Sequence, residues 1–253
     1  MDKKFFRNKV EEIEILINGS SEERKFTSEL IVERSFNLNP YVSIEEILNW
    51  YSKIKKNNAL SLKEINLIDC QKWNIGDEKI SHESNSFFEI IGLEIKNSHS
   101  REIGNRGWYQ PILKEVGFDG GILGLIRKKI SGIPHYLVNA KAEPGNYNEI
   151  QISPTLQATN SNLKAAHGGS RPRYYDYFVE FENDHNVLLN QWLPEDGGRF
   201  YLKRNKGIVI NLPENQKVDL YEDYLWITLN QIVQLIKNHN IINPHLRSLI
   251  SII

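Results

Sequence analysis

An alternation of polar and apolar residues between positions 138 and 159 constrains this chain more than any other feature. The run IQISPTLQAT, from residue 150, places apolar and uncharged polar side chains in turn, and VNAKAE at 138–143 also alternates. A period of two is typical of β-strands with one apolar and one polar face. Pro144, Gly145 and Asn146 supply turn chemistry between the segments. The sequence therefore predicts two strands whose polar faces lie side by side.

Pro154 lies inside the second alternating segment. A proline has no N–H group to donate to a β-ladder, so strands accept it only at an edge or at an interruption. We expect this strand either to lie at an edge or to break at Pro154.

The polar face of that segment is uncharged: Gln151, Ser153, Thr155, Gln157 and Thr159 all carry neutral hydrogen-bonding groups. An isolated alternating strand most often has a solvated face, and this alternative stays open. Neutral donors and acceptors in register can, however, orient a polar ligand without a large cost of charge desolvation. We favour a ligand groove.

Helical signals lie toward both ends of the chain. Ser43 with Glu46, and Thr228 with Gln231, form capping boxes that precede apolar residues at helical spacing. The Asn-Pro dipeptide at 243–244 is typical of a helix cap and first residue. The sequence predicts helices after each of these three signals.

Strands are predicted in the middle of the chain. Residues 87–95 are rich in bulky apolar side chains, and 122–128 with 134–141 flank a turn at 130–133. A second hairpin is expected between 199–204 and 207–212, around Asn-Lys-Gly at 205–207. Paired strands between terminal helices favour an α+β fold.

The stretch NNALSLKEINLIDC gives a candidate boundary, with an N-terminal helical element at 1–60 and the main module at 61–253. It is equally compatible with an ordinary connection inside one continuous domain, 1–253.

Composition restricts the partners. There are 31 Lys and Arg against 32 Asp and Glu, so no overall basic field exists to hold nucleic acid or an anionic membrane. Cys70 is the sole cysteine, which suits a reducing compartment, and no apolar run reaches the length of a membrane span. We expect a cytoplasmic protein.

Several ordered blocks carry a resemblance to a known family: AKAEPGN, QISPTLQATNSN, HGGSRPRYYDYF, PEDGGRFYLKRN, LWITLNQI and INPHLRSLI. Together with HESNSFFEIIGLEI and WYQPIL, the chain from about residue 80 resembles the NDP-hexose 2,3-dehydratases of deoxysugar biosynthesis. The resemblance implies a Nudix-like α/β/α sandwich with a mixed sheet. Such proteins commonly hold two copies of the module, whereas this chain holds one, so we expect a homodimer that replaces the fused pair.

The implied substrate is a nucleotide-linked 4-keto-6-deoxyhexose, expected to be dTDP-4-keto-6-deoxyglucose. Its C4 ketone acidifies the C3 proton, and the C2 hydroxyl leaves as water to give a 3,4-diketo-2,6-dideoxy sugar. A base, an acid and a group that stabilises the oxyanion suffice, so neither a redox cofactor nor a metal is needed in principle.

The matched blocks contain two candidate bases, Glu143 and Glu195, and we rank Glu143 first. Lys141 lies on the same strand face, where it could polarise the ketone or balance the charge of Glu143. The alternative for Lys141 and Glu143 is a surface ion pair of little energetic value. Tyr175 and His82 are further candidate proton carriers.

Substrate binding requires cations and hydrogen-bonding groups. Arg171 and Arg199 lie beside glycines and are candidates for the diphosphate, although each Gly-Gly could be a simple turn and Arg199 could pair with Glu195. Trp108 with Gln110 is the candidate platform for the nucleotide base. The remaining candidates are polar side chains of the matched blocks: Gln151, Ser153, Thr155, Gln157, Asn162 and Asn205.

The sequence bears on two other functions. A Nudix hydrolase requires an acidic metal-binding helix, and REIGNRGWYQ at 101–110 lacks its acidic pair. A non-catalytic nucleotide-sugar-binding module stays open, because a single module can keep the groove without the chemistry.

Overall fold

The computed structural model describes residues 3–38, 40–96, 107–117, 120–163, 170–179 and 186–253. The helices are α1 (Lys3–Glu14), α2 (Ser21–Ser35), α3 (Ile44–Lys56), α4 (Asn160–Leu163), α5 (Leu229–Asn238) and α6 (Pro244–Ser251), with short 3-10 turns at η1 (Leu67–Asp69) and η3 (Tyr175–Phe178). The strands are β1 (Trp73–Ile75), β2 (Lys79–His82), β3 (Phe88–Ile95), β4 (Trp108–Glu115), β5 (Gly121–Ile130), β6 (Ile133–Ala142), β7 (Ile150–Ser153), β8 (Leu156–Ala158), β9 (Val187–Pro194), β10 (Phe200–Tyr201), β11 (Arg204–Leu212) and β12 (Tyr224–Ile227).

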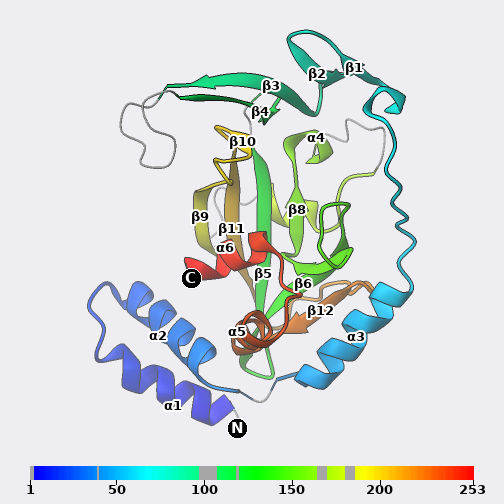
Figure 1. The fold of residues 1–253 in the computed structure, drawn as a ribbon. Helices are drawn as coiled ribbons and strands as arrows, with labels where there is room; N and C mark the ends of the chain where they lie inside the picture. Colours follow the sequence, from blue (N-terminus) through cyan, green and yellow to red (C-terminus); the bar gives the residue numbers. More distant parts are fainter. Residues whose placement is uncertain (1–2, 39, 97–106, 118–119, 164–169, 180–185) are drawn as a thin grey trace.

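The described strands form two sheets (Figure 1). The upper sheet has the order β1-β2-β3-β4-β10. The main sheet has the order β12-β6-β5-β11-β9, with β7 paired to β6 and β8 paired to β5. It is mixed, because β11 runs parallel to β5 and antiparallel to β9. The predicted α+β class, with a mixed sheet and helices at both ends, is confirmed, and the Nudix-like assignment stays a prediction.

Local sequence signals set the helix starts. The capping boxes of Ser43 and Thr228 are both formed, and the Asn243 side chain caps α6 with proline at its first turn. The second helix, α2, begins with the same box, formed by Ser20 and Glu23. These caps satisfy backbone N–H groups that have no partner within the helix.

The main core lies between the main sheet and α3, α5 and α6 (Figure 1). Leu246, Leu249 and Ile250 of α6 are buried in it, and the hydroxyl of Tyr51 on α3 donates to the Ile150 carbonyl oxygen at 2.8 Å. The apolar residues of α6 therefore pack on their own sheet. The homodimer stays a prediction.

The helix α2 is attached to the main sheet by a buried charged cluster. Arg127 on β5 pairs with Glu29 and Glu33 of α2, and the Tyr136 hydroxyl donates to Glu33 at 2.7 Å. A buried charge is tolerated only with such partners. The domain boundary at residue 60 stays a prediction.

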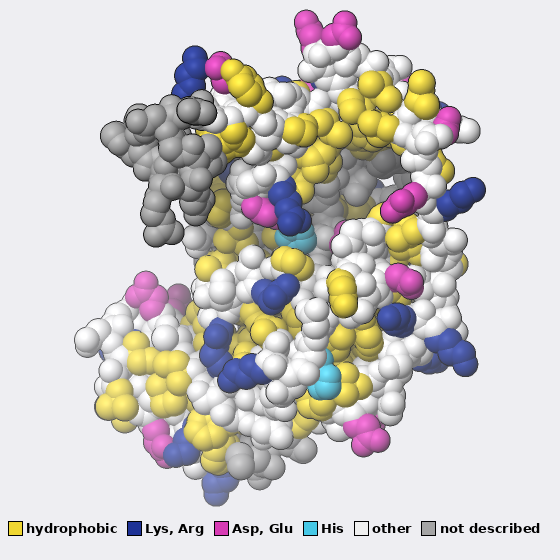
Figure 2. Space-filling model, in the orientation of Figure 1, with side chains coloured by type: hydrophobic (Ala, Val, Ile, Leu, Met, Phe, Trp, Pro, Cys, Tyr) yellow, Lys and Arg dark blue, Asp and Glu magenta, His cyan; other side chains and the backbone are white. Residues whose placement is uncertain are grey.

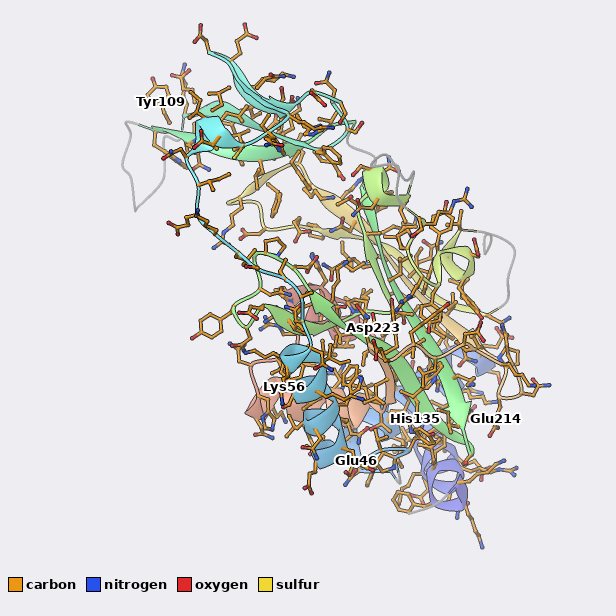
Figure 3. The ribbon with its side chains drawn as sticks, turned by 90° about the vertical axis from the view of Figure 1, so that its right-hand side faces the viewer. Glu46, Lys56, Tyr109, His135, Glu214 and Asp223 are labelled. Carbon is orange, nitrogen blue, oxygen red and sulfur yellow. The ribbon has the colours of Figure 1, made fainter. Side chains whose placement is uncertain are left out.

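From the end of α3, residues 57–72 run to the upper sheet as a connection without long regular structure. Figure 3 shows Lys56 at the beginning of this connection and Tyr109 on the upper sheet. Leu62, Ile65 and Ile68 are exposed along it.

The hairpin predicted between 122–128 and 134–141 is confirmed, with Ile130 opposite Ile133. The second predicted hairpin is wrong, because residues 204–212 form one continuous strand, β11, and residues 200–201 form β10 in the other sheet. Gly207 does not form a turn, and its lack of a side chain instead allows neighbouring residues to pack closely. A Cβ there would lie 2.8 Å from Leu193 and 3.1 Å from Leu249.

The alternating segments behave as predicted in geometry. Along β6 and β7, Asn139 lies opposite Ser153 and Lys141 opposite Gln151, so the polar residues meet in register. The segment breaks at Pro154, which separates β7 from β8.

Candidate functional site

A cavity of about 210 Å³ lies where the upper sheet faces the main sheet. Phe88 on β3 and Phe200 on β10 contribute apolar walls from the upper sheet. Its polar lining comes mostly from the main sheet and the segments next to it: Lys141, Glu143, Gln157, Thr159, Asn162, Glu195, Lys203, Asn205 and His245. In Figure 2, side chains of both charges and a histidine meet on the face just below the upper sheet.

One hydrogen-bonded network holds Glu143, which follows directly after β6. The side-chain amide of Gln157 donates to both carboxylate oxygens at 3.0 Å, and Lys141 Nζ lies 3.8 Å from one of them. Lys141 Nζ also donates to the Gln157 carbonyl oxygen at 2.8 Å. Asn243, the cap of α6, donates to Gln157 Oε1 at 2.7 Å. The carboxylate is thus held in place by a neutral amide and stays close to a cation.

A second network holds Glu195, which follows directly after β9. Asn205 Nδ2 donates to Glu195 Oε2 at 2.8 Å, and Asn205 Oδ1 accepts from Lys203 Nζ at 3.0 Å. Asn205 Oδ1 also lies 3.2 Å from the Gly121 N–H that donates to it. Lys203 Nζ donates in addition to Glu115 Oε2 at 2.8 Å. This cavity wall is therefore a chain of mutually bonded polar groups, in which Glu115, Lys203 and Asn205 are buried and Glu195 is partly exposed.

Both networks combine a carboxylate, an amide and an ammonium group at one small cavity. A positioned carboxylate can accept a proton from carbon next to a carbonyl group, and an ammonium group can stabilise the negative charge that then develops. The amides and Thr159 can hydrogen-bond the hydroxyls of a polar ligand. This set suits acid–base chemistry on a hydroxylated substrate.

Six of the candidate residues are brought together at the cavity: Lys141, Glu143, Gln157, Asn162, Glu195 and Asn205. They come from four separate segments of the sequence. Lys141 and Glu143 do form an ion pair, with about one third of each side chain exposed, and both also bond Gln157, so more than the ion pair holds them together.

Three candidate binding residues lie instead inside the sheet. Gln151, Ser153 and Thr155 are buried and do not line the cavity. The Ser153 hydroxyl donates to the Asn139 carbonyl oxygen at 3.2 Å, and the Thr155 hydroxyl donates to that of Leu137. Thr155 Oγ1 also accepts from the Ile126 N–H at 3.0 Å. The two hydroxyls therefore complete backbone hydrogen bonding around the break at Pro154.

The candidate aromatic platform forms away from the cavity. Trp108 Nε1 donates to Gln110 Oε1 at 2.7 Å on β4, so the two side chains meet as expected, but neither lines the cavity. Tyr175 lies on η3 with the Arg171 guanidinium 5.1 Å from its ring centroid. The ring of His82 packs edge-on against Trp73.

The arginines proposed for the diphosphate are both exposed, and neither lines the cavity. Arg199 lies 3.4 Å from Asp196 and not beside Glu195, which is bonded to Asn205. The glycines next to Arg171, at 168–169, lie outside the described residues.

The structure adds cavity residues that sequence reasoning missed, among them Phe88, Phe200, Lys203 and His245. Lys203 belongs to the block PEDGGRFYLKRN, where the incorrect hairpin hid its burial. His245 follows the cap and first residue of α6. The Asn-Pro signal predicted this helix start, and His245 could have been placed there from the sequence.

Among the described helices, none is long and apolar enough to cross a membrane.

Comparisons with known proteins identify the family of the chain. The family model for NDP-hexose 2,3-dehydratase matches residues 44–253. Three curated relatives carry the name dTDP-4-dehydro-6-deoxy-alpha-D-glucopyranose 2,3-dehydratase. The protein of Saccharopolyspora spinosa is 33% identical over 237 residues, which cover 93% of this chain and 46% of that protein. The protein of Amycolatopsis orientalis is 32% identical (82% of this chain, 44% of that protein), and that of Streptomyces violaceoruber is 31% identical (80% and 44%).

The chain thus spans less than half the length of these relatives. The matched region nevertheless includes every described residue of the cavity. By this match and these identities, the chain belongs to the NDP-hexose 2,3-dehydratase family.

Proposed function

We propose that this chain removes water across C2 and C3 of a nucleotide-linked 4-keto-6-deoxyhexose, with dTDP-4-keto-6-deoxyglucose as the expected substrate. The observation that carries the proposal is the Glu143 carboxylate, held by Gln157 and close to Lys141 at a cavity rich in hydroxyl-binding groups. The names of the relatives support the same substrate class. Because the chain spans less than half of each relative, the activity of this chain alone is our proposal.

In the proposed reaction, Glu143 takes the proton from C3, and the electron pair of that bond moves toward the C4 oxygen. Lys141 and Lys203 both line the cavity and can offset this negative charge. The enolate then expels the C2 hydroxyl, which leaves as water with a proton that we assign to Glu195. The resulting enol rearranges to the 3,4-diketo sugar. The steps lose one water and transfer no electrons to an acceptor.

Turnover of a defined substrate tests the proposal. Purified protein incubated with dTDP-4-keto-6-deoxyglucose should give a product lighter by one water, which mass spectrometry detects. The matched control is dTDP-glucose, which has no C4 ketone to acidify the C3 proton and should stay intact. Binding of the keto sugar without loss of water would instead favour a non-catalytic nucleotide-sugar-binding module.

The homodimer and the cytoplasmic location stay predictions from the sequence and from the family resemblance.

A further inference from the structure

Lys203 lies in the short turn between β10 and β11 and points into the molecule, with 8% of its surface exposed. The preceding residue, Leu202, is 70% exposed and has a φ of 54°, in the left-handed region that leucine rarely adopts. Backbone strain of this kind costs free energy and is concentrated at functional sites. Here the strained turn directs the leucine to solvent and the lysine to the cavity.

The ammonium group of Lys203 has a defined set of partners. It donates to Glu115 Oε2 at 2.8 Å and to Asn205 Oδ1 at 3.0 Å, its two hydrogen-bond acceptors among the described residues. An ammonium group carries three N–H donors, so one remains for a ligand. The ring centroid of Phe88, another cavity residue, lies 5.6 Å from Nζ. A cation beside apolar walls acts on a nearby charge more strongly than it does in water.

The contacts of Lys203 hold its ammonium group in one place. Its hydrogen-bond acceptor Glu115 is a buried carboxylate, and such a carboxylate requires a charged or hydrogen-bonding partner. Lys141 differs, because its side chain is 30% exposed and its ammonium group donates to a main-chain carbonyl oxygen. Of the two lysines, Lys203 is the better fixed to stabilise an oxyanion.

We propose that Lys203 is a catalytic residue that donates its free N–H to the C4 keto oxygen and stabilises the enolate formed when C3 is deprotonated. Lys141 then serves to balance the charge of Glu143. The inference rests on the proposed function and adds the group that stabilises the oxyanion. The competing explanation is that Lys203 and Glu115 only fasten β11 to the upper sheet.

A substrate analogue without a leaving group separates these explanations. In dTDP-4-keto-2,6-dideoxyglucose the C2 hydroxyl is absent, so the enzyme can remove the C3 proton but cannot eliminate water. Incubation in D₂O should then replace the C3 proton by deuterium, which NMR follows position by position. This exchange reports enolate formation alone.

The test variant is the double substitution Lys203→Met with Glu115→Gln, which removes both charges and leaves no buried carboxylate unpaired. We expect the variant and the wild type both to unfold cooperatively on heating, and the variant to exchange the C3 proton at least ~10²-fold more slowly. The matched control is Lys114→Met. Lys114 pairs with the buried Glu89 of the same sheet, outside the cavity, and Glu89 keeps Lys79 as a partner. This control should exchange at the wild-type rate.

A double variant that exchanges the C3 proton for deuterium as fast as the wild type would overturn the inference. So would a variant that keeps exchange with the analogue but loses water elimination from the full substrate, because Lys203 would then act on the leaving hydroxyl. A wild-type protein that neither exchanges nor eliminates would overturn the proposed function itself, and this inference with it.

Discussion

Glu143 has the contacts of a positioned base. Both of its carboxylate oxygens accept hydrogen bonds from the same amide, and that amide is itself fixed by Asn243. Each contact removes a rotational freedom that a catalytic group would otherwise lose during the reaction. The direction of the carboxylate is therefore set before a substrate enters.

The first prediction concerns Glu143→Gln. The substitution keeps the size and hydrogen-bonding capacity of the side chain but removes its ability to accept the C3 proton. Turnover should fall ~10²-fold or more, while the affinity for dTDP, measured by calorimetry, should change little. Glu195→Gln is the matched variant at the second network. An active Glu143→Gln protein beside an inactive Glu195→Gln protein would reverse the two roles.

At the residue scale, the sequence predicted cavity residues where neighbouring positions in the chain were enough to indicate them. Gln157 was found because it alternates along a predicted strand, whereas Glu143 was named because it lies in a block that resembles the family, with Lys141 two residues away on the same strand face. Lys203 was not found, because its partner Glu115 lies 88 residues earlier in the chain, at the end of β4. Ser153 and Thr155 show the opposite error. Their polarity was recognised, but nothing in the local pattern indicates that main-chain groups of β5 and β6 take up their hydroxyls.

At the scale of elements, the break between β7 and β8 interrupts the backbone hydrogen bonding of the sheet. Pro154 has no N–H group, and the chain leaves the ladder there. Thr155 compensates, since its hydroxyl accepts from Ile126 of β5 and donates to Leu137 of β6. The Thr155 side chain thus joins β5 and β6, two strands that contribute residues to the cavity.

The second prediction is that Thr155→Val destabilises the protein without a direct effect on chemistry. Valine keeps the shape but leaves a buried N–H and a buried carbonyl oxygen without this partner. The free energy of unfolding should fall by about 1–3 kcal/mol, measured by denaturant titration, while turnover per folded molecule is kept. Thr27→Val, on an exposed position of α2, is the control and should be nearly neutral. Loss of substrate affinity with unchanged stability would return Thr155 to the binding site.

Element prediction succeeded where a few neighbouring residues suffice. The capping boxes and the turn at 130–133 are set by contacts within four residues. The turn expected at Asn205 does not form, because that residue is paired with residues that are distant in the sequence. It lies opposite Gly121 of β5 and Leu193 of β9, and its side chain bonds Glu195 and Lys203. Turn propensity is a weak preference that such tertiary contacts override.

At the scale of the whole molecule, α6 folds onto its own sheet and covers Gly207. The Arg34 side chain of α2 also donates to the Ile250 and Ile253 carbonyl oxygens at 2.5 and 3.0 Å. The last helix is therefore part of the core of one chain. The apolar face of this helix is therefore not available to a second copy.

The third prediction is that the chain forms a homodimer. Because relatives of this chain are about twice as long, a symmetric pair would restore a comparable total size. Sedimentation equilibrium at micromolar concentration should give the mass of two chains, and dilution should lower turnover and mass together. A single species at the monomer mass with full activity would contradict this prediction.

The cavity has walls on two different sheets, with Phe88 and Phe200 on one and Glu143 and Asn205 on the other. A molecule that fills it contacts both bodies at once. Ligand binding and the position of the upper sheet against the main sheet are then thermodynamically linked. The linkage is reciprocal, so the free energy by which a bound ligand stabilises this arrangement equals the free energy by which the arrangement increases the affinity for the ligand. A substitution on the connection at 57–72 that displaced the upper sheet would therefore change the affinity as well, although none of these residues lines the cavity.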